Sequence, residues 1–329
     1  MVNFDSLLEN WNISKFDSIN EILQGNVNKN WIIKVGSKKF VLKEMEHSKN
    51  EKDLLTEFNY LENLRKNNFP YAIPKPLPTN DNKLFVKLQN TFYWLYIFID
   101  GVIEPKLTNF HLKEIAKMVA IYHKILESGR TLTNNKISIN GYNNFVISEL
   151  QEFLKSVKNH KQLQPEDEIL IKFGSELEAI TQDLNKNHYN KIELYPIHRD
   201  LGGDNLIWSP NELKGVIDFE NVSYCKEPLV KDLSVIISFS CRNDLHQEQT
   251  DYTKMQLLLT EYKQYKNLSF DEIKLIPDFI INGIIEDFNY AYWLFKHNKA
   301  KSNIERLERY AKSAVWHFEN KENLLETLN

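Results

Sequence analysis

Short runs of alternating apolar and polar side chains fill the first hundred residues of the chain. Four of these runs predict strands: Asn30–Val35, Lys38–Met45, Lys83–Leu88 and Thr91–Ile99. The first two flank the dipeptide Gly36-Ser37, which suits a tight hairpin turn, and the last two flank Gln89-Asn90. The pattern therefore predicts a small antiparallel sheet in this region.

A helical repeat separates the two pairs of strands. Leu54, Phe58, Leu61 and Leu64 recur at helical spacing, and Ser48 precedes them as a plausible N-cap. A proline-rich stretch then interrupts regular structure before the second strand pair begins. We expect one helix to accompany the sheet.

After Gly101 the pattern changes to long amphipathic segments. Helices are predicted at roughly 109–127, 144–159 and 166–185, with several more from Leu229 to the end. One interruption occurs where two short apolar runs, 205–208 and 214–219, flank a polar turn, and these runs predict a hairpin. The carboxyl-terminal two-thirds of the chain are thus expected to be mainly helical.

Composition limits the classes of partner. The chain has 329 residues, 42% of them hydrophobic, and 41 Lys and Arg residues against 45 Asp and Glu residues give a formal net charge of -4. No global basic field exists to attract nucleic acid or an acidic membrane, so a small-molecule partner fits better. Cys225 and Cys241 are too few for a disulfide framework or a cysteine zinc site, which favours a reducing cytoplasm. The sequence shows neither a signal peptide nor a membrane anchor.

The stretch YPIHRDLGGDNLIW, residues 195–208, concentrates polar side chains between apolar runs. Asp200 and Asn205 lie in it, and Asp218 follows after the predicted hairpin. A loop that enters a hairpin can hold its first acid beside a substrate hydroxyl, while Asn205 and Asp218 converge on one Mg²⁺, which prefers hard oxygen ligands. Gly202 and Gly203 would allow the backbone to approach phosphate closely.

This spacing resembles that of the protein-kinase-like superfamily, and within it the aminoglycoside and choline phosphotransferase family. The chain lacks the Ala-Pro-Glu signature of protein kinases, and VIDFENVSYCKEPLVKDLSVI runs almost directly from Asp218 to Asp232, as in small-molecule kinases. The segments YLENLRKNNFPYAIPKPLPTNDNKLF and YIFIDG are most similar to bacterial homoserine-kinase-like and spore-coat CotS-like members. The resemblance spans nearly the whole chain.

The resemblance implies an α+β, bilobal protein-kinase-like fold. Residues 1–99 would form a nucleotide-binding N-lobe, with a small antiparallel sheet and one main helix. Residues 100–329 would form a larger, mainly helical C-lobe with the catalytic loop and substrate pocket. The implied activity is transfer of the γ-phosphate of ATP, with Mg²⁺, to a hydroxyl of a small molecule in the cytoplasm.

The resemblance also implies a set of nucleotide-binding residues. In FVLK, Lys43 shares a strand face with Val41 and would contact the α- and β-phosphates, as in the kinase Val-Ala-Ile-Lys strand. Glu57, preferred over Glu62 one turn later, would hold Lys43. The remaining candidates are the phosphate-loop residues Gly25, Asn26 and Asn28, and the hinge residues Ile97, Phe98 and Ile99, whose backbone would bind adenine.

In the catalytic loop, the family pattern implies that Asp200 accepts or orients the hydroxyl hydrogen. His198 would brace the loop by hydrogen bonding, and Asp232 would tie a helix to it. Asn205 and Asp218 would hold the metal.

The acceptor is harder to infer. Homoserine kinases of this family carry an arginine where this chain has Glu286 and Asp287, and two acids favour an ammonium group over a carboxylate. Glu220 and Glu227 point the same way, so we hypothesise a cationic alcohol, similar to an aminoglycoside or choline. A homoserine-type or sugar kinase, a protein kinase, and a non-catalytic kinase-fold structural protein remain alternatives. The sequence does not indicate an oligomeric state.

Overall fold

The computed structural model describes most of the chain in two compact units. It describes residues 2–22, 28–45, 49–104, 106–128, 139–184, 193–223, 226–297 and 303–328. The first unit comprises Met1–Glu104 and Asp204–Tyr224, and the second comprises Pro105–Gly203 and Cys225–Asn329. Gly25, Asn26, Ser48 and Cys225, which were singled out in the sequence, lie outside the described residues.

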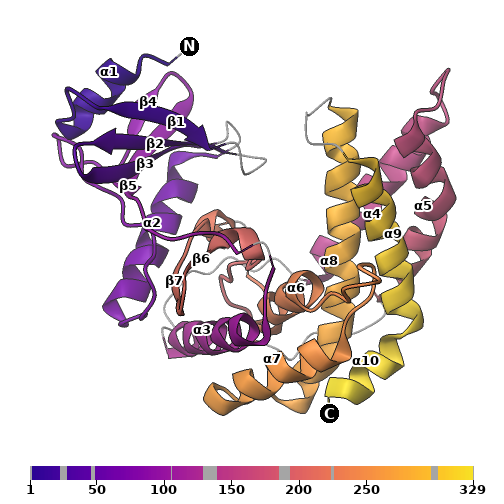
Figure 1. The fold of residues 1–329 in the computed structure, drawn as a ribbon. Helices are drawn as coiled ribbons and strands as arrows, with labels where there is room; N and C mark the ends of the chain where they lie inside the picture. The colour runs from indigo at the N-terminus through magenta and orange to yellow at the C-terminus, as the bar shows by residue number, and fades with distance from the viewer. Residues whose placement is uncertain are drawn as a thin grey trace. The chain divides into compact units, whose positions relative to one another are not determined.

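The first unit is built on an antiparallel sheet, whose described strands have the order β1-β2-β3-β5-β4 (Figure 1). Their bounds are β1 Ser18–Ile22, β2 Lys29–Val35, β3 Lys38–Glu44, β4 Val86–Leu88 and β5 Thr91–Ile97. The predicted hairpin turn is present, with Gly36 at a φ of 58° in the left-handed region that favours glycine. The α+β class inferred from the sequence is confirmed.

The two faces of the sheet bury different apolar clusters. On one face, Leu42 and Leu95 pack with residues of helix α1 (Phe4–Leu8) and the short turn η1 (Glu9–Trp11). On the other face, Val41 packs with residues of β5 and of helix α2 (Glu51–Lys66). Because side chains alternate along a strand, Lys43 points to the same face as Val41, toward the side that α2 covers.

The N-cap of helix α2 is Asn50, two residues beyond the predicted cap Ser48. The Asn50 side chain accepts hydrogen bonds from the backbone N–H groups of Lys52 and Asp53, and the Asp53 side chain accepts one in return from the Asn50 N–H. This reciprocal capping box fixes the start of the helix. The apolar stripe predicted from the sequence is buried as expected.

A second, two-stranded sheet is formed by β6 (Leu206–Ser209) and β7 (Glu212–Val216). Backbone hydrogen bonds join β7 to Ala72, from Ala72 N to Lys214 O at 2.9 Å and from Val216 N to Ala72 O at 2.9 Å. Gly215 is required there because a Cβ atom would lie 2.6 Å from the Ala72 carbonyl oxygen. These bonds explain why residues 204–224 group with the first unit, whereas the sequence placed this hairpin in a lobe of residues 100–329.

The second unit is helical in its described residues, as the amphipathic pattern predicted. The helices are α3 Asn109–Ser128, α4 Ile139–Val157, α5 Pro165–Leu184, α6 Val230–Ser240, α7 Tyr252–Tyr265, α8 Phe270–Lys296, α9 Ile304–Glu319 and α10 Lys321–Leu328. Helix α8 packs against α6 and α9, and α3 packs against α7. Phe288 and Tyr292 of α8 are fully buried in the core of this unit.

The two neighbouring leucines of α2 allow a direct test of the core. Leu54 is 1% exposed and Leu55 is 39% exposed. We expect Leu54→Ala to lower the free energy of unfolding by about 2–5 kcal/mol, because a buried cavity is created. Leu55→Ala should change it by less than about 1 kcal/mol. Urea denaturation measures both, and equal losses would contradict the assignment of the buried face.

Candidate active site

Lys43 lies at the centre of a buried polar cluster in the first unit. It is 4% exposed, in β3, and its Nζ atom lies 2.5 Å from Asp218 Oδ1 and 3.7 Å from Glu220 Oε2. Burial by itself would lower the pKa of Lys43, but the charges of Asp218, Glu220 and Glu57 hold this pKa above its ordinary value. The ammonium group is therefore charged and held in one place.

Glu57 is the acid of α2 that lies near Lys43. Burial raises the pKa of Glu57 to about 7, although the charge of Lys43 opposes the shift. Glu62, the alternative considered from the sequence, is instead on the surface, with its carboxylate 3.1 Å from Arg65 Nη2. Among the described residues, Lys43 forms ion pairs within 4 Å with Asp218 and Glu220. Glu57 lies beyond that distance, and its charge raises the pKa of Lys43.

Glu220 belongs to this cluster, in the turn η3 (Phe219–Ser223), and not to a separate group of substrate-binding acids. Its carboxylate accepts a hydrogen bond from the Asn28 side-chain amide, and its backbone carbonyl accepts one from Lys49 Nζ at 2.7 Å. The structure thus brings Asn28, predicted in the phosphate loop, beside Glu220 and Lys43. Sequence reasoning missed Lys49, which is buried and follows β3 without any local motif to mark it.

The hairpin brings the two candidate metal ligands to the same end of β6 and β7. Asn205 directly precedes β6, Asp218 follows β7 by two residues, and the Asn205 carbonyl accepts a hydrogen bond from Ile217 N at 3.0 Å. Asp218 has a φ of 67°, an uncommon conformation for a residue other than glycine. This backbone conformation is typical of residues held in place at functional sites.

The donor set around Asp218 fits a bound Mg²⁺. Asp218 and the Asn205 side chain offer hard oxygen atoms of the kind Mg²⁺ prefers. The neighbouring carboxylates of Glu57 and Glu220, together with Asp218, face two ammonium groups, those of Lys43 and Lys49. This surplus of acidic groups would be balanced by an added cation. In the described part of the chain, no cluster of three or more His, Cys, Asp or Glu side chains is arranged to hold a metal by itself.

The predicted hinge lies at the end of β5. Ile97 pairs with Phe40 across the sheet, and its side chain is 62% exposed. The Phe98 N–H donates to the Lys39 carbonyl at 3.0 Å, and the Phe98 ring lies 5.1 Å from Lys39 Nζ. The Phe98 amide is therefore already bonded to the sheet, which leaves the rest of this segment as the candidate for adenine binding.

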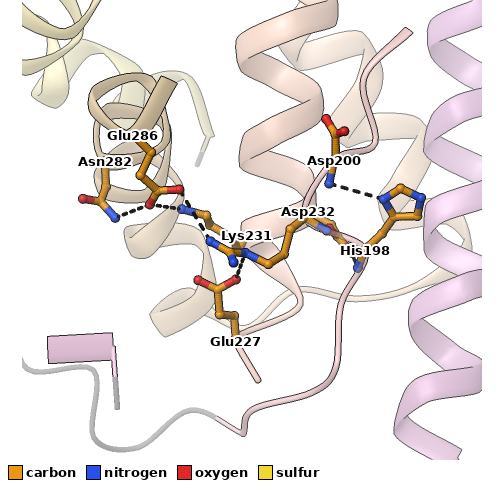
Figure 2. Close-up of polar contacts among 8 residues, drawn as sticks. His198, Asp200, Glu227, Lys231, Asp232, Asn282 and Glu286 are labelled. Atoms are coloured by element: carbon orange, nitrogen blue, oxygen red, sulfur yellow. Dashed lines mark hydrogen bonds and ion pairs between the residues drawn. The ribbon is translucent and has the colours of Figure 1, made fainter. Parts of the chain in front are cut away.

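In the second unit, Asp232 fixes the backbone of the loop that carries Asp200. The Asp232 carboxylate accepts hydrogen bonds from the backbone N–H groups of Arg199 at 2.7 Å and His198 at 3.3 Å. The Asp200 N–H in turn donates to His198 Nδ1 at 3.3 Å (Figure 2). These contacts confirm the structural roles expected of His198 and Asp232, and Arg199 is held with a φ of 65°.

A second polar network contains Glu227, Lys231, Asn282 and Glu286 (Figure 2), together with the Arg199 side chain. Arg199 Nε lies 2.7 Å from Glu227 Oε2, and Arg199 Nη2 lies 3.6 Å from Glu286 Oε2. Lys231 Nζ donates to Glu286 Oε1 at 3.1 Å, and the Asn282 amide donates to the same oxygen at 3.0 Å. Glu227 and Glu286 are thus engaged with cations of the chain itself, contrary to the expectation that they would attract an ammonium group of the substrate.

Asp287, next to Glu286, has a different environment. Burial and the charge of Glu286 raise the pKa of Asp287 to about 7, while Arg306 and Arg242 oppose the shift. Asp287 is thus partly protonated at neutral pH. The acids proposed for substrate binding were Glu220, Glu227, Glu286 and Asp287. Of these, Asp287 is the one that forms no ion pair within 4 Å among the described residues.

Comparisons with known proteins identify a family and relatives of this chain. The family model described as "Phosphotransferase enzyme family" matches residues 18–266. A homoserine kinase of Sinorhizobium medicae is 22% identical over 269 residues, which cover 81% of this chain and 76% of that protein. A homoserine kinase of Rhizobium rhizogenes is 25% identical over 274 residues, which cover 81% of this chain and 79% of that protein.

Solved structures with the same fold include several kinases of small molecules. An aminoglycoside phosphotransferase from Alicyclobacillus acidocaldarius has a TM-score of 0.68 at 14% identity, covering 100% of this chain and 95% of its own. A microcompartment-associated aminopropanol kinase has a TM-score of 0.66 at 14% identity, covering 99% of both chains. A spectinomycin phosphotransferase in complex with ADP and spectinomycin has a TM-score of 0.63 at 14% identity, covering 98% and 95%. The kinase-like fold inferred from the sequence is confirmed.

Across the described helices, none is both long enough and apolar enough to span a membrane.

The raised pKa of Glu57 predicts a pH-dependent stability. Its folded-state pKa of about 7 exceeds the ordinary value of 4.5, so the folded protein binds the extra proton between these values. The contribution of Glu57 to the free energy of unfolding must therefore fall as pH rises through this window. Relative to the wild type, Glu57→Gln should gain up to about 3 kcal/mol of stability between pH 4.5 and 7.

Urea denaturation from pH 4.5 to 8 measures this difference. Glu62→Gln, on the same helix but on the surface, is the matched control and should give a constant offset from the wild type. Parallel stability profiles for Glu57→Gln and the wild type would show that Glu57 is not protonated in this way.

Proposed function

Because the chain belongs to the phosphotransferase enzyme family, we propose that it transfers the γ-phosphate of ATP to a hydroxyl group of a small amino alcohol. The observation that carries the proposal is the buried Lys43, held by Asp218 and Glu220 beside Glu57. A fixed cation next to carboxylates that suit a metal is what binding of a triphosphate requires. A buried ion pair adds little to stability, so a purely structural protein would have no use for a buried charge held in this way.

The residues of the first unit would bind the nucleotide. Lys43 would contact its phosphates, and Asn205 and Asp218 would hold Mg²⁺, which neutralises phosphate charge when bound. Val41 would contact adenine, together with backbone groups of Ile97–Ile99. Glu57 and Glu220 would keep Lys43 in position, and Asn28 would orient Glu220. Gly25, which lies outside the described residues, would belong to the phosphate loop, as the family resemblance implies.

Asp200 would accept or orient the hydrogen of the acceptor hydroxyl. Its loop is fixed by Asp232 and His198, so the carboxylate is placed before the acceptor arrives. Phosphoryl transfer depends mainly on such positioning and on charge neutralisation. A fixed loop therefore supports this role for Asp200.

The choice of an amino alcohol draws on the relatives. Homoserine and aminopropanol, named in the descriptions of proteins similar to this chain, each carry a hydroxyl and an amino group. Asp287, with no cation of the chain within 4 Å in the described residues, is the group we propose for the amine. We thus retain the cationic acceptor inferred from the sequence but assign its binding to Asp287 alone, since Glu286 is paired with Arg199 and Lys231.

Asp200→Asn should lower kcat roughly 10²- to 10⁴-fold, because the hydroxyl loses its proton acceptor. Magnesium-dependent ADP release from ATP measures this across homoserine, 3-amino-1-propanol, choline, aminoglycosides and simple sugars. Asp204→Asn is the control, since Asp204 lies in the same loop but is exposed. Turnover by Asp200→Asn at nearly the wild-type rate would rule out its role.

Nucleotide binding should respond to Lys43 and not to Asp200. We expect Lys43→Met to weaken ATP binding by roughly tenfold or more, because a charge-assisted contact to phosphate is lost. Asp200→Asn should bind ATP as the wild type does. Titration calorimetry measures both affinities, and circular dichroism checks the fold. If the wild type neither binds ATP nor releases ADP with any acceptor, the chain is a non-catalytic binding protein.

A further inference from the structure

Three arginine side chains gather around Tyr310 and Asp287 in the second unit. Arg306 and Arg309 lie one turn apart on α9, and their guanidinium groups are 5.3 Å and 5.9 Å from the centre of the Tyr310 ring. Arg306 Nε also donates to the Tyr310 hydroxyl at 2.9 Å. Arg242 follows α6. Burial is the largest cause of its lowered pKa, and the charges of Arg309 and Arg306 lower this pKa further, so the three guanidinium groups lie within electrostatic range of one another. We call Arg242, Arg306 and Arg309 the arginine cluster.

Among the described residues, the arginine cluster differs from the other arginines because it lacks close ion pairs. The other arginines that the structure describes, Arg65 and Arg199, each lie within 3.1 Å of a carboxylate oxygen. Within the described residues, no ion pair under 4 Å is formed by any member of the cluster. The Nε atom of Arg309 is also buried without a hydrogen-bond partner. The three side chains are half-buried. Because like charges held close together repel one another, a bound anion would relieve the repulsion among them.

The charge of Asp287 acts on two members of the cluster and neutralises the cluster only in part. It acts on the pKa of Arg242 and of Arg306, so its carboxyl group lies within electrostatic range of both. Burial raises the pKa of Asp287 to about 7, so a fraction of these carboxyl groups is neutral at physiological pH. Asp287 therefore supplies at most one negative charge to the three guanidinium groups.

The arginine cluster borders the loop of Asp200 within the same unit. The Arg242 guanidinium stacks 5.1 Å from the centre of the Phe239 ring. Atoms of that ring lie 4.0 Å from the position that a Cβ atom would take at Gly202, and Asp200 Oδ1 lies 3.9 Å from the same position. On the other side, Glu286, the neighbour of Asp287, pairs with Arg199, which precedes Asp200. A ligand at the cluster would therefore lie near the proposed catalytic acid.

We propose that Arg242, Arg306 and Arg309 bind a carboxylate group of the phosphate acceptor. Guanidinium groups bind carboxylates through paired, charge-assisted hydrogen bonds, and the five donors of each group exceed what Tyr310, Gln247 and Ser238 accept. With Asp287 on the amine, the acceptor class becomes an alcohol that carries both an amino group and a carboxylate. This inference rests on the proposed function, because it names the substrate class of the same site.

The clearest test compares three alcohols that differ by one group at a time. Homoserine carries an amine and a carboxylate, 3-amino-1-propanol lacks the carboxylate, and 4-hydroxybutanoate lacks the amine. Calorimetry with the Asp200→Asn protein measures binding of each without turnover, and inorganic phosphate serves as a second anionic probe. We expect homoserine to bind roughly 10- to 100-fold more tightly than 3-amino-1-propanol, the range set by loss of charged hydrogen bonds.

Variants locate the effect in the cluster. Arg306→Gln and Arg242→Gln should each weaken binding of homoserine and of 4-hydroxybutanoate by roughly tenfold or more. Both should leave 3-amino-1-propanol unaffected. Lys312→Gln removes a charge from the surface of the same helix, where it pairs with Glu308, and should change none of the affinities. Arg306→Lys keeps the positive charge, so it separates loss of binding from loss of folding, which thermal unfolding also monitors.

Four results would overturn the proposal: 3-amino-1-propanol binds as tightly as homoserine, neither carboxylate binds, the arginine variants bind the carboxylates like the wild type, or only inorganic phosphate binds. Failure of the proposed function gives a different pattern. In that case homoserine binds in an Arg306-dependent manner, but the wild type releases no ADP in its presence.

Discussion

The buried ammonium group of Lys43 is the constraint on which the first unit depends. An unpaired charge at that position would cost several kcal/mol, so carboxylates must be brought to it. They come from segments far apart in the sequence: Glu57 from α2, and Asp218 and Glu220 from the segment after β7. Because the buried charge of Lys43 requires these carboxylates, α2 and the hairpin are held against the sheet.

The same cluster explains the unusual acid in α2. Three carboxyl groups that share the surroundings of Lys43 repel one another, and Glu57 is also removed from water. Its proton is therefore retained to a higher pH than the ordinary value, while Asp218 forms the shortest contact with Lys43. Adding a cation at Asp218 would relieve this repulsion, which links the electrostatics of the unit to metal and nucleotide binding.

Strained backbone is held by polar contacts in both units. Residues other than glycine with positive φ cost about 1–3 kcal/mol each, and Arg199 and Asp218 both adopt this conformation. The Asp232 carboxylate holds the Arg199 N–H, and the ion pair with Lys43 holds the Asp218 side chain. In each unit a buried charge determines the conformation of a loop, so that the loop is set before any ligand binds.

Local patterns in the sequence predicted the features that depend on neighbouring residues. The hairpin at Gly36, the apolar stripe of α2 and the long helices follow from periodicities of two and of 3.6 residues. Strand β1, with the sequence SINEI, was missed because its alternation is weak and polar. The polar loop before the hairpin singled out Asp200, Asn205 and Asp218, and the family resemblance added Lys43. The structure places Lys43 beside Asp218, and the catalytic and metal-binding roles of the four residues stay predictions.

What the sequence could not predict was which charges neutralise each other. Glu286 and Asp287 are adjacent and chemically similar, yet Glu286 pairs with Lys231, which lies 55 residues away, and Asp287 lies among arginines of other elements. Since no local pattern records such pairings, two acids on α8 suggested a negative pocket. Apart from Glu286, which is paired, the charges that act on Asp287 are those of Arg306, Arg242 and Lys231. The selectivity of a site follows from its unpaired charges. Here these are the arginine cluster and the partly protonated Asp287, which favours an acceptor that carries a carboxylate as well as an amine over a purely cationic one.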